Sequence, residues 1–87
     1  MGNQQVGYCV YLLRSQVDGG YYIGQTDDLE RRLKEHAAGR VRSTRPRRPL
    51  ALVGRMIFAT RQEARFFEWD LKRHSDKKRR FIRSMSE

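Results

Sequence analysis

Residues 21–36, YYIGQTDDLERRLKEH, constrain the fold most, because a strand pattern gives way to a helix pattern within a few positions. Residues 21–23 are aromatic or β-branched, as strands prefer, and Gly24 then interrupts the run. Asp27 is placed to cap the helix that follows, with Glu30 completing a capping box. We therefore expect a strand that turns directly into a helix.

The helix in this stretch has two distinct faces. Leu29, Leu33 and Ala37 recur every fourth residue, which predicts a buried stripe. Arg32 and His36 have the same spacing, so they should point the same way from a neighbouring face. Taken alone, Arg32 could instead pair with Asp28, and His36 could simply suit the last turn of the helix.

The preceding residues predict a β-hairpin. Residues 8–13, YCVYLL, are apolar on both alternating faces, which is typical of a strand covered on both sides. Residues 16–20 contain Asp-Gly-Gly, a strong turn signal, before the second strand. An even-length loop places Tyr11 and Tyr22 on one face of the sheet, and a four-residue loop would set them directly opposite each other. Taken alone, each tyrosine could equally be a core residue with a hydrated hydroxyl group.

Residues 39–49, GRVRSTRPRRP, form a basic segment after the first helix. Gly39 fits the C-terminal cap of that helix, and the two prolines exclude a continuous helix or a central strand. Composition leaves two interpretations open, a solvated charged loop or a loop that grips phosphates. The arginines of the second interpretation are Arg40, Arg42, Arg45, Arg47 and Arg48.

The rest of the chain predicts one more strand and two more helices. Residues 50–58 read as the third strand, with Gly54 as a candidate bulge. Thr60 and Glu63 form a capping box for a helix that extends to about residue 73. A short last helix buries Phe81, Ile82 and Met85 and carries the basic residues Lys77, Lys78 and Arg79. The expected fold class is α/β, a small, mainly antiparallel three-stranded sheet flanked by about three helices.

Length and charge narrow the class of protein. Eighty-seven residues suffice for one domain, residues 1–87, with its core at about 8–83. Nineteen Lys and Arg against ten Asp and Glu leave a net charge of +9, as expected of a nucleic-acid-binding protein. We find no segment suited to entering or lying on a membrane. The single cysteine, Cys9, suits a reducing cytoplasm, and its apolar strand predicts a buried, unreactive thiol.

Glu68 is the unusual residue of the second half. It shares a helix face with Ala64, Phe67 and Leu71, and burying a carboxylate there is costly unless a cation or metal compensates its charge. Two interpretations stay open at this point. Glu68 is either a boundary residue paired with a nearby arginine or a metal ligand.

Five elements occur in one order along the chain: Val10-Tyr11, Tyr22-Ile23-Gly24, Arg32, His36 and Glu68. This series resembles the GIY-YIG nuclease superfamily from about residue 8 to residue 80, most closely its small stand-alone bacterial members. Arg32 is preferred to Arg31 because it lies ten residues after Tyr22 and one turn before His36. Cys9 and Val10 replace the glycine and isoleucine of the family's first motif, and no asparagine follows Asn3.

The resemblance implies a metal-dependent endonuclease that hydrolyses phosphodiester bonds, in DNA rather than RNA, in repair or recombination. Glu68 would hold one Mg²⁺ or Mn²⁺ ion, which prefers oxygen ligands and keeps several waters. Arg32 would hold the scissile phosphate. Tyr11 would accept a proton from the attacking water, directly or through a network, and a protonated His36 could help to lower its pKa. Tyr22 and His36 would orient the water and the tyrosine.

The sequence leaves one alternative from a different functional class, a catalytically silent basic domain that binds DNA or RNA. Glu68 and Tyr11 separate the two hypotheses, because a pure binding domain has no use for them. In either case, the basic loop, the basic C-terminal segment or a protein partner must supply any specificity. The sequence gives no oligomeric state.

Overall fold

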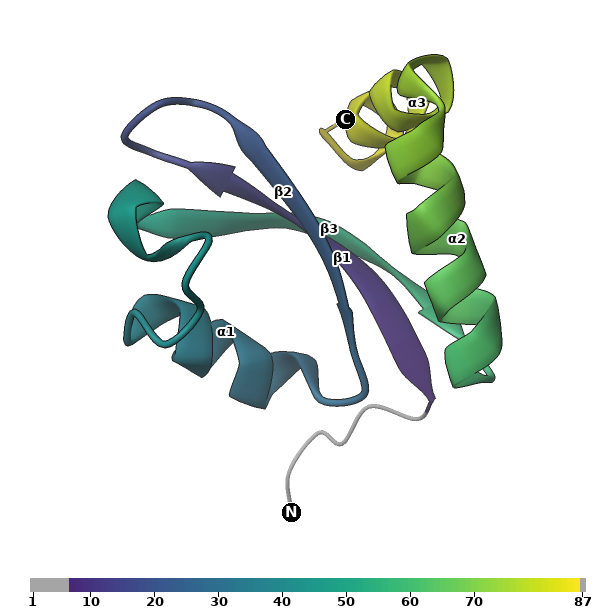
Figure 1. The fold of residues 1–87 in the computed structure, drawn as a ribbon, viewed down its shortest axis with the longest axis horizontal. Coiled ribbons are helices and arrows are strands. Elements are labelled where there is room, and N and C mark those ends of the chain that lie inside the picture. Colours follow the sequence, from purple (N-terminus) through teal and green to yellow (C-terminus); the bar gives the residue numbers. More distant parts are fainter. Residues whose placement is uncertain (1–6, 87) are drawn as a thin grey trace.

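The computed structural model describes residues 7–86, which form one antiparallel sheet and three α-helices (Figure 1). The elements are, in order, β1 (Tyr8–Ser15), β2 (Tyr21–Thr26), α1 (Leu29–Ala37), the 3-10 turn η1 (Arg45–Arg47), β3 (Leu50–Phe58), α2 (Arg61–Arg73) and α3 (Ser75–Ser86). In the sheet, β1 lies between β2 and β3 and is antiparallel to both. The predicted fold class is therefore confirmed.

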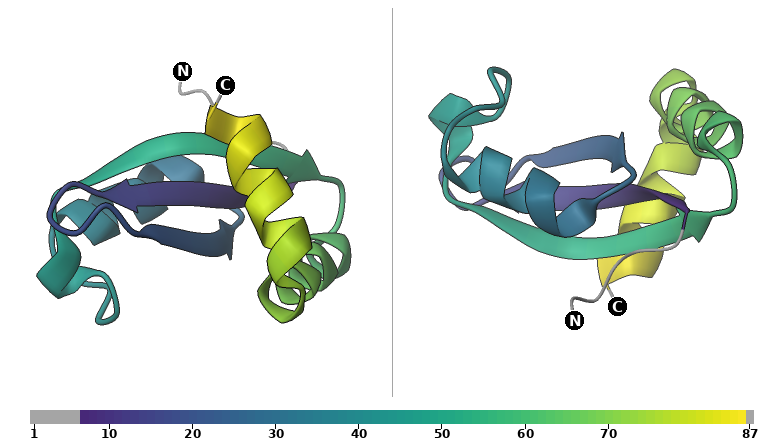
Figure 2. Two further views of the ribbon diagram at one scale, coloured as in Figure 1. Left: turned by 90° about the horizontal axis from the view of Figure 1, so that it is seen from above. Right: turned by 90° about the horizontal axis from the view of Figure 1, so that it is seen from below.

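The central strand β1 separates two cores, because its alternate side chains point to opposite faces of the sheet. On one face, Tyr11 and Leu13 pack with Leu29 of α1. On the other face, Val10 and Leu12 pack against α2 and α3. Figure 2 shows α1 and α3 on opposite sides of the sheet. Both faces of β1 are therefore covered, as the sequence predicted.

The register of the hairpin decides how the two motif tyrosines meet. Tyr11 lies opposite Gly24, and Tyr22 lies opposite Leu13. The two tyrosines therefore share a face, as predicted for an even-length loop, and the register, which the sequence left open, makes them diagonal neighbours and not directly opposed. The Tyr11 ring instead covers Gly24, where a β-carbon would lie 2.6 Å from the tyrosine hydroxyl oxygen. Glycine at this position makes room for the tyrosine.

Helix α1 begins one residue later than the sequence suggested. Asp28, and not Asp27, is the N-cap, and its carboxylate accepts a hydrogen bond from the backbone N–H of Arg31. The buried residues of the helix are Leu29 and His36, whereas Ala37 is exposed. The predicted apolar stripe is wrong at its last member because the helix turns the histidine, and not the alanine, toward the sheet.

Gly39 ends α1 as predicted. Its φ of 78° lies in the left-handed region that glycine adopts at low cost. The backbone N–H of Gly39 donates to the carbonyl of His36, and that of Arg40 donates to the carbonyl of Glu35. This pair of bonds is the Schellman arrangement, which satisfies the last carbonyls of a helix. The chain then enters the basic loop directly beside the His36 turn.

The second half matches the prediction with one shift. The bulge in β3 is at Val53, because Leu12 pairs with Gly54 and Leu13 pairs with Leu52. Gly54, the predicted bulge, instead gives room to Met85 of α3, whose sulfur would lie 2.6 Å from an added β-carbon.

The two C-terminal helices also follow the sequence. Both hydrogen bonds of the capping box between Thr60 and Glu63 are present at the start of α2. In α3, Phe81 is buried, and Ile82 and Met85 pack half-buried against the same core. Among residues 7–86, no helix has both the length and the apolar character needed to cross a membrane.

We predict that Gly24→Ala destabilises the domain by about 1–3 kcal/mol, because the added methyl group overlaps the Tyr11 ring. Urea denaturation measures this change. Gly20→Ala is the control, since its β-carbon would mainly meet the flexible end of the Arg47 side chain, at 2.6 Å. Equal losses from the two variants would contradict a specific role for the tyrosine ring over Gly24.

Candidate active site

Three aromatic rings meet on the α1 face of the sheet. The His36 ring lies 5.7 Å from that of Tyr11 and 5.2 Å from that of Tyr22, both in edge-to-face geometry, and the two tyrosine rings are 6.3 Å apart. The Tyr11 hydroxyl group is 2.9 Å from His36 Nε2. Tyr11 is fully buried and His36 almost so. Three of the predicted site residues, from two strands and one helix, therefore form one compact cluster.

Thr44, in the basic loop, holds the other side of the histidine. Its Oγ1 is 2.8 Å from His36 Nδ1 and also donates, over 3.4 Å, to the carbonyl of Val41. A hydroxyl group has one hydrogen, so we assign Thr44 as the acceptor of the Nδ1–H bond. Nε2 of the neutral imidazole is then free to accept the hydrogen bond of the Tyr11 hydroxyl group. The loop thereby fixes the tautomer of the histidine.

Burial and charge set the protonation states in this cluster. Burial, together with the nearby Arg32 cation, lowers the pKa of His36 below its usual 6.5, so the imidazole is neutral at pH 7. A neutral His36 does not supply the positive charge by which a protonated His36 could lower the pKa of Tyr11. Burial raises the pKa of Tyr11 to about 12, against the lowering effect of its hydrogen bond with Arg32. Tyr11 and His36 thus form a neutral donor–acceptor pair.

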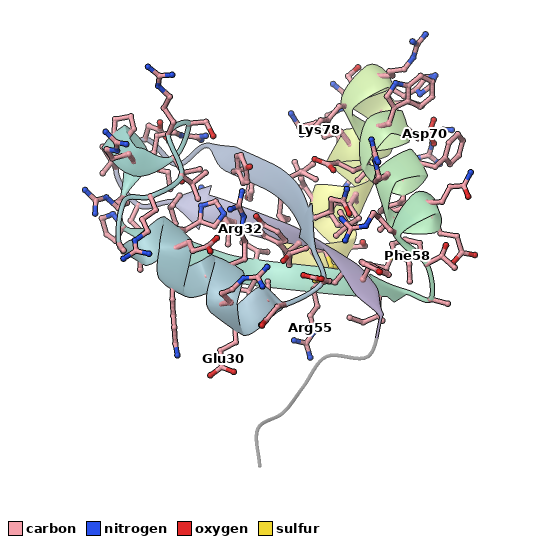
Figure 3. All side chains as sticks on the ribbon, turned by 60° about the horizontal axis from the view of Figure 1, so that its bottom comes forward. Glu30, Arg32, Arg55, Phe58, Asp70 and Lys78 are labelled. Atoms are coloured by element: carbon pink, nitrogen blue, oxygen red, sulfur yellow. The ribbon has the colours of Figure 1, made fainter. Side chains whose placement is uncertain are left out.

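Arg32 extends from α1 over the sheet, whereas Glu30 points away from it (Figure 3). The Nη1 atom of Arg32 lies 2.9 Å from Oε1 of Glu35. The alternative pairing of Arg32 with Asp28 is wrong, because the Asp28 carboxylate caps the helix. Hydrogen bonds to Glu35 and Tyr11 raise the pKa of Arg32, so the guanidinium stays charged. A permanent cation therefore lies beside the tyrosine hydroxyl group.

Glu68 lies on α2, on a different element from the ring cluster. Its partner is Lys72, whose Nζ lies 2.7 Å from Glu68 Oε2, and not a buried arginine. The Glu68 side chain is 19% exposed and the Lys72 side chain 51%. The Glu68 carboxylate is also one of the charges that raise the pKa of Tyr11. It is therefore close enough to act electrostatically on the ring cluster.

This arrangement of strand tyrosines, helix arginine and histidine, and α2 glutamate agrees with a family comparison. The model of the GIY-YIG catalytic domain matches residues 7–80. The chain belongs to the GIY-YIG family.

The similar proteins include other small bacterial members of this family. The chain is 36% identical over 81 residues to the UPF0213 protein BH0048 of Halalkalibacterium halodurans, covering 92% of this chain and 85% of that protein. It is 40% identical over 70 residues to a UPF0213 protein of Bacillus pumilus, covering 79% and 70% of the two chains. The family as a whole implies a nucleic-acid substrate and, typically, a divalent metal.

A solved structure supports the fold. The solution NMR structure of the UPF0213 protein BH0048 from Bacillus halodurans superimposes with a TM-score of 0.56 at 37% sequence identity. The match covers 90% of this chain and 83% of that one. The GIY-YIG fold therefore extends over nearly the whole described chain.

The donors in this GIY-YIG domain suit a metal that needs few protein ligands. Within residues 7–86, no three His, Cys, Asp or Glu side chains gather as a metal-binding group. Glu68 offers one carboxylate, and Mg²⁺ can accept a single protein carboxylate while waters and phosphate oxygens complete its shell. Lys72 occupies one oxygen of that carboxylate, but a half-exposed ion pair of this kind is weak and easily exchanged.

The basic loop is more ordered than a solvated charged segment. Arg45 donates to the carbonyl of Gly39, and Arg48 donates to those of Arg45 and Ala37. Arg47 pairs with Asp18 in the hairpin turn. These three arginines therefore hold the loop against α1 and the hairpin, although Arg45 and Arg48 are as exposed as Arg40 and Arg42.

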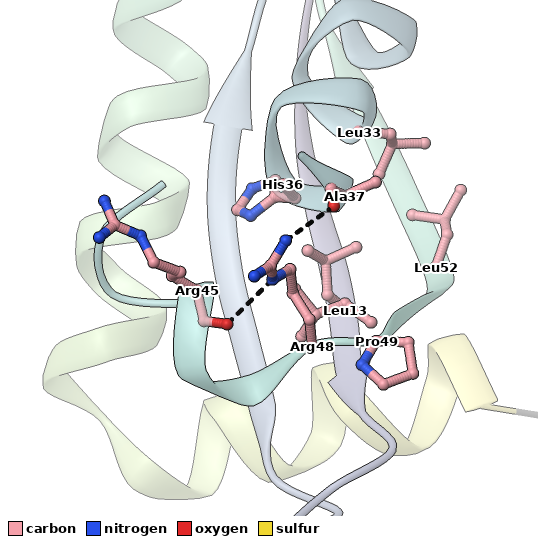
Figure 4. A pocket seen from close by; sticks show the side chains of 9 residues that line it. Leu13, Leu33, His36, Ala37, Arg45, Arg48, Pro49 and Leu52 are labelled. Atoms are coloured by element: carbon pink, nitrogen blue, oxygen red, sulfur yellow. Dashed lines mark hydrogen bonds between the residues drawn. The ribbon is translucent and has the colours of Figure 1, made fainter. Parts of the chain in front are cut away.

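A pocket of about 490 Å³ lies between α1 and β3, beside His36 (Figure 4). Leucine side chains make up much of its wall, and Arg45 and Arg48 lie at its edge. The Arg48 guanidinium is already bonded to the loop and to Ala37. Of the three residues in the ring cluster, His36 lines this pocket, whereas Tyr11 and Tyr22 do not.

The basic residues of the last helix are distant from the loop. Lys77 pairs with Asp70 of α2 over 3.0 Å, Lys78 is half-buried and Arg79 is exposed. Figures 1 and 2 show α3 and the loop at opposite ends of the molecule. The two predicted basic segments are therefore separate surfaces and not one patch.

Thr44 and Glu35 are site residues that the sequence analysis did not identify. The i, i+3 spacing of Glu35 from Arg32 was a usable signal for their ion pair. Thr44 gave no such signal, because only the path of the loop brings it to His36.

We predict that Thr44→Val destabilises the domain by about 1–3 kcal/mol, because the buried Nδ1–H of His36 loses its acceptor. The histidine ring ¹⁵N shifts should also change from one tautomer toward the other. Thr44→Ser keeps the hydroxyl group and should preserve those shifts. Unchanged ring shifts in Thr44→Val would show that Thr44 does not set the tautomer.

Proposed function

We propose that this GIY-YIG protein is a divalent-metal-dependent endonuclease that hydrolyses phosphodiester bonds in DNA. The observation that carries the proposal is the buried hydrogen bond between the Tyr11 hydroxyl group and a neutral His36, with the Arg32 cation beside it. The pair also holds strand and helix together, but binding nucleic acid does not by itself require an arginine beside the tyrosine hydroxyl group. The cluster suits proton transfer at a phosphate.

Tyr11 acts as a relay in this proposal. With a pKa of about 12 it is protonated at pH 7 and cannot be a base by itself. It can accept a proton from the attacking water as it passes its own proton to Nε2 of His36. Thr44 keeps Nε2 unprotonated for that step. Tyr22, in edge-to-face contact with His36, helps to orient the imidazole and the water.

Arg32 has two roles that follow from its contacts. In the free protein it is bonded to Glu35 and to the tyrosine hydroxyl group. A phosphate that draws the guanidinium away from these partners exposes the Tyr11 hydroxyl group to the attacking water. The guanidinium then stabilises the negative charge that grows on the phosphate in the transition state. Substrate binding and exposure of the relay are thereby coupled.

Glu68 would hold the divalent metal, Mg²⁺ or Mn²⁺, after releasing Lys72. When bound, the ion supplies positive charge to the phosphate oxygens. Lys72, half-exposed on a flexible stem, can then turn toward the phosphate backbone or solvent.

Nucleic-acid binding would use the two separate basic surfaces, the 39–49 loop and α3. Arg40 and Arg42 of the loop and Arg79 of α3 are exposed and suited to phosphates. Arg45, Arg47, Arg48 and Lys77 add positive charge while they also bond within the fold, and Lys78 adds charge from a half-buried position on α3. Specificity in repair or recombination would come from these surfaces or from a protein partner.

Nicking of supercoiled plasmid DNA, with Mg²⁺ and with a chelator in its place, tests the proposal. We expect Mg²⁺-dependent conversion to the open-circle form. Tight plasmid binding with no nicking under either condition would favour the silent binding domain instead.

We predict that Arg32→Lys lowers turnover about a hundredfold or more, because an ammonium group cannot reproduce the planar two-pronged contact with phosphate. Arg31→Lys is the matched control, since Arg31 is 57% exposed and pairs only with carboxylates of its own helix region. Its turnover should stay within about twofold of wild type. A larger loss at Arg31 would overturn the role given to Arg32.

We predict that Glu68→Gln abolishes Mg²⁺-dependent nicking, because the ion loses its protein carboxylate. Plasmid binding should persist, and the free energy of unfolding should change by less than about 1 kcal/mol, since the Lys72 pair is partly exposed. Lys72→Gln breaks the same ion pair but keeps the carboxylate, so it should still nick. Equal loss of nicking in both variants would indicate that the ion pair, and not metal binding, is what matters.

A further inference from the structure

The outer face of α2 exposes two large aromatic side chains that the core does not use. Phe66 is 63% exposed and Trp69 is 51% exposed. Their rings stack with centroids 5.9 Å apart and an angle of 30° between the planes. The same helix buries Ala64 and Leu71 on its other side. A neighbouring pair of exposed aromatic rings is typical of a binding surface.

Cations surround this aromatic pair. The Arg73 guanidinium lies 4.6 Å from the centre of the Trp69 ring. Arg61, Gln62 and Arg65 line one shallow hollow together with the two aromatic residues. We name these six residues the α2 aromatic face: Arg61, Gln62, Arg65, Phe66, Trp69 and Arg73.

The carboxylates closest in sequence to Trp69 do not offset these cations. Glu68 is paired with Lys72, and Asp70 is paired with His74 and Lys77. Arg61 is paired with Asp27 over 4.0 Å, and no ion pair of Arg65 or Arg73 is found among residues 7–86. The α2 aromatic face therefore combines flat apolar rings with a positive rim.

We propose that the α2 aromatic face binds an unpaired strand of DNA. Aromatic side chains stack on bases of any sequence, and flanking arginines contact the phosphates between them. A duplex does not offer its base faces, because they are already stacked on one another. A protein partner would have to match both the rings and a strongly positive rim. Exposed rings, guanidinium groups and a net charge of +9 are complementary to a single strand.

The position of this face relates it to the proposed cleavage site. Trp69 follows Glu68 in α2, about 100° further round the helix axis. The two side chains therefore lie on different faces of α2, and a strand stacked on Trp69 would pass round the helix to reach the candidate metal ligand. If the proposed nuclease function holds, the substrate would carry unpaired bases close to the scissile bond. The choice of DNA rests on that function, whereas stacking can be measured without cleavage.

Trp69 is the single tryptophan of the chain, so its fluorescence reports directly on this face. The full chain is titrated, with EDTA present to prevent metal-dependent cleavage, with a twelve-nucleotide oligothymidylate and with a twelve-base-pair duplex. We expect the single strand to quench the fluorescence strongly and the duplex to quench it little. Phe66→Ala and Phe66→Leu should each weaken single-strand affinity about tenfold, because both remove the ring and neither changes the charge.

Val17→Ala is the matched control, since Val17 is an equally exposed apolar residue, 64% accessible, in the hairpin turn. Its single-strand affinity should equal that of the wild type. Absence of quenching, or equal effects of Phe66→Ala and Val17→Ala, would overturn the proposal. Tighter binding of an oligouridylate would overturn the assignment to DNA. A dimer in sedimentation that Trp69→Ala dissociates would assign the face to a second copy of the chain.

The two proposals fail separately. Quenching by the single strand without any plasmid nicking would reject the nuclease function but leave the stacking surface standing. Nicking without quenching would reject the stacking surface but leave the nuclease function standing.

Discussion

The hydrogen bond between Tyr11 and His36 is the interaction on which the candidate site depends. It joins the central strand of the sheet to α1, with both side chains almost fully buried. A buried polar pair of this kind is tolerated only when its remaining polar atoms also have partners. Thr44 supplies one of these partners and thereby ties the basic loop to the same point. Strand, helix and loop are all positioned by one histidine ring.

Space around that ring is provided by small residues. Gly24 leaves room for the Tyr11 ring, and Gly39 ends α1 so that the chain can return to His36. The close approach of Tyr11 to Gly24 gives a physical reason for the glycine that follows Tyr22 and Ile23 in the second motif.

Some of the basic side chains of this domain stabilise the fold, and others are left facing solvent. Arginines of the 39–49 loop bond to backbone carbonyls and to Asp18, so they order a segment with little apolar area of its own. Arg32 is paired with Glu35 on the same helix. The net charge of +9 is therefore divided between groups that hold the structure and groups, such as Arg40, Arg42 and Arg79, that face solvent.

Local sequence determined the elements themselves. The continuous apolar run at residues 8–13, the Asp-Gly-Gly turn and the capping box at Thr60 depend on neighbours within a few positions, so they could be predicted and were found. The family resemblance likewise indicated Tyr11, Tyr22, Arg32, His36 and Glu68. The cap of α1 was predicted one residue early, because Asp27 and Asp28 are chemically equivalent until the chain direction selects one of them.

Tertiary structure decided which residues that are distant in the sequence come into contact. The register placed Tyr11 over Gly24 and not against Tyr22, since it is set by the whole sheet and not by the turn alone. The protonation states of Tyr11 and His36 follow from burial, which no local pattern gives. Thr44 reaches His36 only through the path of the loop. By contrast, the pair of Glu68 with Lys72 follows from their i, i+4 spacing within α2. The sequence supplied the chemical groups, and the packing of two cores around β1 determined which of them meet.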